Sequence, residues 1–401
     1  MTFPYQELLS LKFDIVAIAA SGAALVFAVL ILSLLLPRLF RVTRRIRRDN
    51  AIASGAVEAE ATFRPVTVIV TSSHEATNLR TLLPQILEQD YPAPMEVIVV
   101  DDDDDEGVTP GVVSQLQDVY SNLYMTYAPA TSRNLSRKKL AITLGVKAAR
   151  YDWLVFTNGN CRVESPLWLR LMALGFARGN KVVLGYSIPR PSDDAVEKGG
   201  RRRRAFDAVR TAAQWLGAAI GGRPYRGDGN NLGYTRQLFM EQRGFEKSLT
   251  LVNGDDDIFV SQLASVAPAD VMVARDAMVV DLERHPEKAA RDEYDARRFT
   301  GRYLRRSTPL MWGFMSLLWW LWLAATAVAV ATGLPSLVPA AAMLLVMIGL
   351  WIPVMVTWRR LSRLLDAAPL FWTVVPLTLI HPVLTLFRRF RRSDVKNYTW
   401  Q

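Results

Sequence analysis

Two runs of carboxylates hold the residue types needed for ligand binding or proton transfer. Residues 101–106 are all acidic and directly follow the segment Glu-Val-Ile-Val-Val, while Asp255, Asp256 and Asp257 precede an apolar, helix-like segment. A run such as residues 101–106 usually forms a solvated acidic loop. A run such as residues 255–257 usually caps the N-terminus of the helix that follows it. The chemical interpretations are a ligand site at the first run and a general base at Asp256, whose pKa the neighbouring carboxylates would raise.

Two further polar segments follow short β-branched runs. Asn158 and Asn160 flank a glycine just after residues 153–157, and two side-chain oxygens at alternate positions of a turn can hold a hard cation. On its own, an asparagine–glycine pair indicates an ordinary turn. Residues 71–75, Thr-Ser-Ser-His-Glu, follow another such run, where they either meet a nucleoside or cap a helix.

Alternating strand and helix patterns position these polar segments. The β-branched runs are residues 66–71, 97–100, 153–157 and 182–186, with helical stretches at 77–89 and 138–150. This alternation predicts an α/β domain with a mainly parallel sheet and helices on both of its faces. Because open parallel sheets bind ligands at the carboxyl ends of their strands, we expect the chemistry at the polar segments that follow these strands.

Apolar segments at both ends predict membrane helices. Residues 14–36 have no internal charge and reach the ~20 residues that a bilayer core requires. The arginines that follow are Arg38, Arg41, Arg44, Arg45, Arg47 and Arg48. By the positive-inside rule they place the amino terminus outside and the next domain in the cytoplasm. Residues 310–332 and 337–358 predict a transmembrane hairpin. Prolines interrupt the apolar stretch 369–387, which favours a re-entrant or interfacial segment over another crossing.

The composition of the chain limits which classes of partner it can bind and which cell compartment it occupies. The chain is 50% hydrophobic with a net charge of +10, and its arginines cluster beside the apolar segments, which favours anionic lipid headgroups over nucleic acid. Cys161 is the sole cysteine, so an intrachain disulfide and a cysteine-based zinc site are both excluded.

We expect a multi-pass protein of the inner or plasma membrane. Its parts are residues 1–48, an amino-terminal anchor with a basic flank; 49–62, a linker; 63–309, the cytoplasmic α/β domain; 310–358, the hairpin; and 359–401, the re-entrant or interfacial segment with a basic tail.

Four arginines at residues 201–204 precede a segment with helical periodicity. Phe206, Val209, Trp215 and Leu216 recur there at near-helical spacing. The pattern predicts a helix lying on the membrane surface, and an ordinary core helix is the alternative.

An ordered set of motifs carries a family resemblance. They are Glu88-Gln-Asp-Tyr-Pro92, Lys138-Lys-Leu-Ala-Ile-Thr-Leu-Gly145, Tyr151-Asp-Trp153, Gly227-Asp-Gly-Asn-Asn-Leu-Gly-Tyr234 and Gly254-Asp-Asp-Asp-Ile-Phe259. Residues 63–310 resemble the family 2 inverting glycosyltransferases, in particular the branch of ceramide glucosyltransferase-like and polysaccharide-synthase-like membrane enzymes. The arrangement of apolar segments, one before and two after, agrees with it. The resemblance implies a GT-A fold and an inverting hexosyltransferase that uses a nucleoside diphosphate sugar.

The resemblance also assigns roles by position. At the donor, it implies that Lys138 lies near the ribose or phosphates. The residues that would contact the nucleoside are Thr71, Ser72, Glu75, Asp101 and Asp102. Asn158 and Asn160 occupy the metal-binding Asp-x-Asp positions. Asp256 would take the proton from the acceptor hydroxyl, with Asp255 beside it. The family's Gln-x-x-Arg-Trp motif is echoed only by residues 295–299, where Arg298 would face the pyrophosphate and the tryptophan is absent.

The amides at the metal positions leave two interpretations open. The implied cofactor is Mg²⁺ or Mn²⁺, and the loss of two carboxylates predicts that it is held weakly or not at all. If transfer persists, the partners are a nucleotide-diphosphate sugar and a lipid or glycolipid acceptor in the membrane. The alternative is a catalytically silent accessory subunit that retains the fold and assists a partner synthase.

Overall fold

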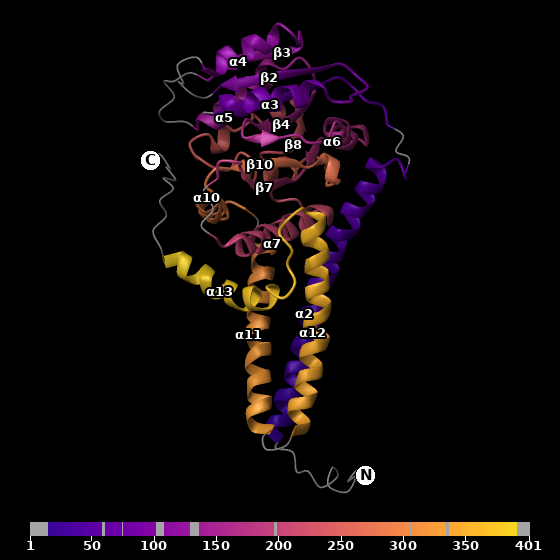
Figure 1. The fold of residues 1–401 in the computed structure, drawn as a ribbon, viewed down its shortest axis with the longest axis vertical. Helices are drawn as coiled ribbons and strands as arrows, with labels where there is room; N and C mark the ends of the chain where they lie inside the picture. Colours follow the sequence, from indigo (N-terminus) through magenta and orange to yellow (C-terminus); the bar gives the residue numbers. More distant parts are fainter. Residues whose placement is uncertain are drawn as a thin grey trace. The chain divides into compact units, whose positions relative to one another are not determined.

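A computed structural model describes residues 15–57, 61–73, 75–101, 108–128, 136–195, 199–304, 307–333 and 337–390. The chain divides into two compact units. One is an α/β unit made of Arg41–Arg305 with Leu364–Ala367, and the other is built from apolar helices before and after it in the sequence. Figure 1 labels many of the elements of each unit.

A seven-stranded, mostly parallel sheet forms the centre of the α/β unit (Figure 1). Its strands are β1 (Val66–Ser72), β2 (Met95–Asp101), β3 (Leu123–Tyr127), β4 (Trp153–Asn158), β6 (Val182–Leu184), β8 (Leu232–Thr235) and β9 (Ala269–Val271), in the order β3-β2-β1-β4-β8-β6-β9. Within it, β8 runs antiparallel to both of its neighbours, β4 and β6. The predicted α/β architecture, a mainly parallel sheet covered by helices, is therefore confirmed.

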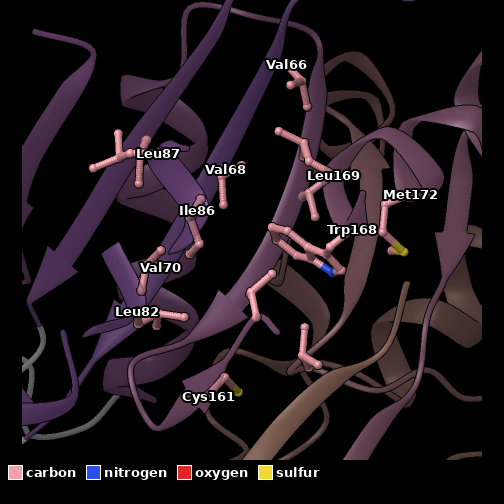
Figure 2. Packing of buried hydrophobic residues seen from close by; sticks show 14 of the residues in the cluster. Val66, Val68, Val70, Leu82, Ile86, Leu87, Cys161, Trp168, Leu169 and Met172 are labelled. Carbon is pink, nitrogen blue, oxygen red and sulfur yellow. The ribbon is translucent and has the colours of Figure 1, made fainter. Parts of the chain in front are cut away.

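Helices cover both faces of the sheet because alternate side chains of each central strand point to opposite sides. The helices next to it are α3 (Ala76–Leu87), α4 (Val108–Gln117), α5 (Arg137–Ala148) and α6 (Trp168–Ala177). On one face, Val68 and Val70 of β1 pack with α3 and with Trp168 of α6 in one core (Figure 2). On the other face Ile69 meets α5 at Gly145, where a Cβ would stand 2.7 Å from the Ile69 side chain.

A smaller three-stranded sheet adjoins the first. It consists of β5 (Cys161–Arg162), β10 (Val279–Glu283) and β7 (Ser187–Pro191), in that order. Strand β10 pairs antiparallel with β5 and parallel with β7. Because β5 begins three residues after β4 ends, the β4–β5 turn joins the two sheets, and residues 158–160 lie in that connection.

The remaining elements of the α/β unit are mostly helical. They are α7 (Arg201–Ile220), α8 (Arg236–Glu241), the 3₁₀ turn η1 (Glu246–Ser248), α9 (Ile258–Leu263), the 3₁₀ turn η2 (Arg275–Ala277) and α10 (Pro286–Thr300). In α7 the apolar positions Phe206, Val209, Trp215 and Leu216 are all buried in the protein. Helix α7 therefore follows the core-helix alternative at these positions, and the membrane-surface prediction was wrong for this face.

The first membrane-length helix, α2 (Ile15–Ala53), continues well beyond its apolar part. It extends into residues 49–53, which were predicted to begin a linker. Arg45 of this helix forms ion pairs of 2.9 Å with both Asp49 and Asp270, and the Asp49 carboxylate accepts a hydrogen bond from the Val273 N–H (3.1 Å). Arg45 is thus used inside the α/β unit, and its charge is not free to face lipid headgroups.

Apolar helices make up the second unit. Among the described residues, three helices are long and apolar enough to cross a membrane: Ile15–Ala53, Leu310–Gly333 and Ala340–Leu364. The last two belong to α11 (Ser307–Gly333) and α12 (Leu337–Leu364), where Trp319 stacks on Trp351 with ring centroids 4.5 Å apart. Helix α13 (Val374–Phe390) has 17 residues with Pro382 inside it, which is shorter than the ~20 residues of a full crossing.

Candidate active site

The carboxyl ends of β1, β2 and β4 meet at one edge of the large sheet. The strand register pairs Ser72 with Asp101 and Thr71 with Asn158. The Thr71 hydroxyl donates a hydrogen bond of 2.6 Å to Asn158 Oδ1. The structure thus brings together four of the residues singled out from the sequence, while Asp102 lies outside the described residues.

The Asn158-Gly159-Asn160 turn packs directly against the segment that follows β1. A Cβ at Gly159 would stand 3.1 Å from Glu75 Cβ and 3.2 Å from Ser72 Oγ, so a larger residue here would crowd both side chains. Asn78 of α3 fixes this turn, because its Nδ2 donates to the carbonyls of Gly159 (2.6 Å) and Cys161 (2.8 Å). The Ser72 hydroxyl is buried there and has no hydrogen-bond partner in the described part of the chain.

The two amides at the metal positions contact side chains from the second half of the domain. Asn158 Nδ2 donates to Asn230 Oδ1, and Asn160 Nδ2 donates to Asp281 Oδ1 at 2.6 Å. Asp281 lies on β10, which no sequence pattern had predicted. Burial, followed by the charge of Asp228, raises the pKa of Asp281 to about 7. A carboxyl group that sequence reasoning missed therefore stands beside the amide pair.

Asp228, whose charge acts on the Asp281 carboxyl, is held in place by hydrogen bonds. Its Oδ2 accepts hydrogen bonds from both the N–H and the hydroxyl of Ser187, each at 2.7 Å, and its Oδ1 accepts from the Asn230 N–H at 3.1 Å. Burial still raises the pKa of Asp228 above its ordinary value, against these hydrogen bonds. Asp228 and Asn230 stand in the quoted Gly227–Tyr234 motif, which was the signal that could have singled them out.

These donors fit a divalent cation only in part. Carboxylate and carbonyl oxygens are the ligands that Mg²⁺ and Mn²⁺ accept, and the amide oxygens of Asn158 and Asn160 with the Asp281 carboxylate are of that kind. In the described residues, however, no group of three or more His, Cys, Asp or Glu side chains is arranged to hold a metal ion. The donor set at this turn is thus mainly neutral, with one carboxylate.

In the second acidic run, Asp257 takes the helix-capping role. Its Oδ1 accepts from the Ile258 N–H at 2.6 Å at the start of α9, and its Oδ2 accepts from the Thr300 hydroxyl. Gly254 just before the run has a φ of 103°, a conformation that favours glycine. Since Asp257 caps the helix, Asp255 and Asp256 are available for other roles.

Asp255 and Asp256 have opposite electrostatic environments. Asp255 forms an ion pair of 2.8 Å with Lys138 Nζ, and that cation holds the pKa of Asp255 below its ordinary value despite burial. Burial, then the charges of Asp255 and Asp257, raise the pKa of Asp256 to about 7, against the opposing charges of Arg226 and Lys138. Two adjacent carboxyl groups with pKa values pushed apart are typical of acid–base sites.

The loop at residues 227–231 connects the amide turn with the acidic run. A Cβ at Gly229 would stand 3.4 Å from both Lys138 Nζ and Asp256 Cβ, while the next residue, Asn230, contacts Asn158. The Gly227 N–H also donates to the Asp256 carbonyl at 2.9 Å. This loop therefore links the amide turn, Lys138 and the second acidic run in one polar site.

Helix α10 carries Arg298, the arginine of the segment 295–299. Its neighbour Arg297 donates to Thr211 Oγ1 (2.6 Å) and pairs with Glu293 (3.4 Å). Arg226, which the sequence had not singled out, also pairs with Glu293 (3.7 Å). The charge of Asp256, ahead of those of Glu293 and Asp257, acts against burial to hold the pKa of Arg226 above its ordinary value. Arg226 thus supplies a positive charge near Asp256.

Part of the chain matches a known protein family. Residues 67–233 match the family model for glycosyl transferase family 2. The matched segment includes Lys138, both amides, Asp228 and Asn230, and it ends before Asp255 and Asp281. No curated protein matches the sequence.

Two solved structures are similar to this chain at low sequence identity. The chain is 18% identical to the mannosyltransferase PcManGT from Pyrobaculum calidifontis, solved with GDP-Man and Mn²⁺, over 86% of this chain and 96% of that one, with a TM-score of 0.49. It is 15% identical to residues 1–349 of S. aureus TarS, over 83% of this chain and 94% of that one, with a TM-score of 0.41.

Proposed function

We propose that this protein is a membrane-bound glycosyltransferase that moves a hexose from a nucleoside diphosphate sugar to a lipid or glycolipid acceptor, with inversion. The match to the glycosyl transferase family 2 model supports a transferase. The observation that carries the proposal is Asp256, a buried carboxyl whose pKa is raised to about 7 beside an Asp255–Lys138 ion pair. A base with that pKa is suited to accept a proton near neutral pH.

In the proposed reaction Asp256 removes the proton from an acceptor hydroxyl. The acceptor oxygen then forms a bond to the anomeric carbon from the side opposite the diphosphate, and the bond from that carbon to the diphosphate oxygen breaks. The diphosphate leaves with the electron pair of the broken bond. Asp255 holds Lys138 in place (2.8 Å), so that the ammonium group stabilises the charge on the leaving group.

The donor lies, in this proposal, at the carboxyl edge of the sheet. Its nucleoside contacts are Thr71, Ser72, Glu75, Asp101 and Asp102. The unpartnered Ser72 hydroxyl supports this placement, since a buried donor without a partner is costly unless a ligand engages it. Arg298 and Arg226 add positive charge for the phosphates. A bound Mg²⁺ or Mn²⁺ would neutralise the diphosphate, held by Asn158, Asn160 and Asp281.

The membrane helices support a lipid acceptor. In the part of the chain that the structure describes, three helices are long and apolar enough to span a bilayer. An acceptor confined to the same membrane is presented at a higher effective concentration than one in solution. We further propose that residues 63–309 form a cytoplasmic domain, that residues 310–358 form a transmembrane hairpin, and that residues 359–401 form a re-entrant or interfacial segment with a basic tail. We infer a location in the inner or plasma membrane.

One observation favours a second function. The Asp-x-Asp positions hold amides that already bond to Asn230 and Asp281, as expected if metal-dependent transfer has been lost. The protein would then be a catalytically silent accessory subunit that binds a nucleotide sugar for a partner synthase.

One assay tests both functions. Full-length protein in lipid nanodiscs is given a panel of sugar nucleotides with a polar lipid extract, and release of nucleoside diphosphate is measured with and without Mn²⁺ or Mg²⁺. We expect release by the wild type, and a loss of roughly 10²-fold or more in Asp256→Asn, with donor affinity by calorimetry nearly unchanged. Donor binding without release in both proteins supports the accessory subunit and contradicts the transferase.

A further inference from the structure

Two adjacent lysines at the start of α5 have different contacts. Lys138 pairs with the Asp255 carboxylate and is 37% exposed at its side chain, whereas Lys139 is fully buried at 0%. Lys139 Nζ donates to the backbone carbonyls of Ser248 (2.6 Å), Leu251 (2.9 Å) and Asn253 (2.8 Å). An ammonium group has three donors, and Lys139 uses all of them on one short segment.

That segment, residues 248–253, leads directly into the acidic run. It is followed by Gly254, with its positive φ, and then by Asp255 and Asp256. Ser136 binds the same segment, because its N–H donates to the Leu249 carbonyl (3.0 Å) and its hydroxyl to the Val252 carbonyl (3.2 Å). The first turn of α5 therefore fixes, across more than a hundred residues of sequence, the backbone that presents the two carboxylates.

The contacts require the charged form of Lys139. Burying a cation is costly unless it is fully hydrogen-bonded, and burial lowers the pKa of Lys139 to about 8, against the raising effect of Asp255, Asp257 and Asp256. A neutral amine has two N–H donors and a lone pair. Loss of the proton would therefore leave one carbonyl without a donor and place a lone pair near it.

We propose that Lys139 is a positioning residue for sugar transfer: its ammonium group holds residues 248–253 so that Asp255 stays paired with Lys138 and Asp256 stays aligned with the acceptor hydroxyl. This inference rests on the proposed function of Asp256. Lys139 touches neither donor nor acceptor, and it acts only through the backbone that it fixes. A displacement of about 1 Å at a reacting group can cost on the order of 10²-fold in rate.

The test compares Lys139→Met and Lys139→Arg with Lys147→Met, which removes an exposed lysine from the same helix. Nucleoside diphosphate release gives kcat and KM for the donor from pH 6 to 9.5, and amide hydrogen exchange follows residues 248–254. We expect Lys139→Met to lower kcat at least tenfold with donor KM changed less than about threefold, and to speed exchange in that segment. A misplacement of this kind acts on the reacting group rather than on donor binding. Lys147→Met should match the wild type in each measurement.

The pH profile separates positioning from a merely structural role. Wild-type kcat should fall above pH 8 as Lys139 loses its proton, and Lys139→Arg should shift that fall to higher pH because a guanidinium stays charged. If neither lysine variant binds donor, Ser136→Ala, which removes one hydrogen bond to the same segment, should lower kcat several-fold at unchanged KM. Wild-type kcat in Lys139→Met, or in Ser136→Ala where Lys139→Met does not bind donor, overturns the role of Lys139. An inactive wild type overturns the proposed function itself.

Discussion

Asp281→Asn should stabilise the protein at alkaline pH, although it alters a side chain in the proposed donor site. The pKa of Asp281 is raised from 3.8 to about 7, chiefly by burial and then by the charges of Asp228 and Glu293. Since the folded state holds this proton more tightly than the unfolded state, the stability contributed by the protonated group is fully present below pH 3.8. It is lost as pH rises through 7.

The size of the effect follows from the shift. About three pKa units at 1.36 kcal/mol each put the cost of the buried charge at about 4 kcal/mol above pH 7, an upper limit because neighbouring carboxyls share the titration. An asparagine carries no charge, and its Oδ1 can still accept the hydrogen bond that Asn160 donates. We expect the variant to gain about 1–4 kcal/mol at pH 8 and less than half of that at pH 5.

Thermal unfolding of the protein in detergent at pH 5 and pH 8 measures this gain in stability. The midpoint of Asp281→Asn should rise by roughly 2 °C or more at pH 8, with a smaller rise at pH 5. Asp193→Asn is the matched control, because its side chain is 91% exposed and the same substitution should change little there. An Asp281→Asn protein that is no more stable than the wild type at pH 8 would refute the assignment of a strained, buried charge.

Three further predictions concern activity, metal and topology. Transfer should increase as pH rises through about 7, where Asp256 loses its proton, and a flat kcat/KM between pH 5.5 and 7.5 would place the base elsewhere. Asn158→Asp combined with Asn160→Asp should lower the Mn²⁺ concentration for half-maximal donor binding in calorimetry, since anionic oxygen binds hard cations more tightly; weaker donor binding at every Mn²⁺ concentration would show that the amides do not serve a metal. Asp193→Cys should react with an impermeant maleimide only after intact cells are permeabilised, and labelling without permeabilisation would contradict a cytoplasmic α/β unit.

Local sequence pattern predicted the elements that are long and buried on both sides. Strand β1 was expected at residues 66–71 and spans Val66–Ser72, and α3 was expected at 77–89 and spans Ala76–Leu87. Continuous β-branched runs and a 3.6-residue apolar period identify such elements because burial itself imposes the pattern. The first carboxylate run, which begins at the end of β2, and the amide turn at the end of β4 could be located for the same reason.

The parts that were missed depend on contacts distant in sequence. Strand β8 has four residues, one of them Gly233, and it becomes a strand by pairing with β4 and β6. Such short strands follow their tertiary neighbours more than their own propensity. Asp281 meets Asn160 across 121 residues, so nothing in the residues around either one indicates that the Asp281 carboxyl group lies beside the amide turn. Likewise, no local pattern distinguished Lys139 from Lys138.

The buried thiol of Cys161 makes the native chain a convenient background for site-directed probes. Its side chain is fully enclosed at 0% exposure, and burial raises the pKa of the thiol far above its usual range. Since thiolates are the reactive form, maleimides and spin-label reagents should ignore it while the protein is folded. Pairs of introduced cysteines, one in each compact unit, can then be labelled without removing a core side chain. Distances between two spin labels would measure how the helical unit and the α/β unit are arranged in a bilayer.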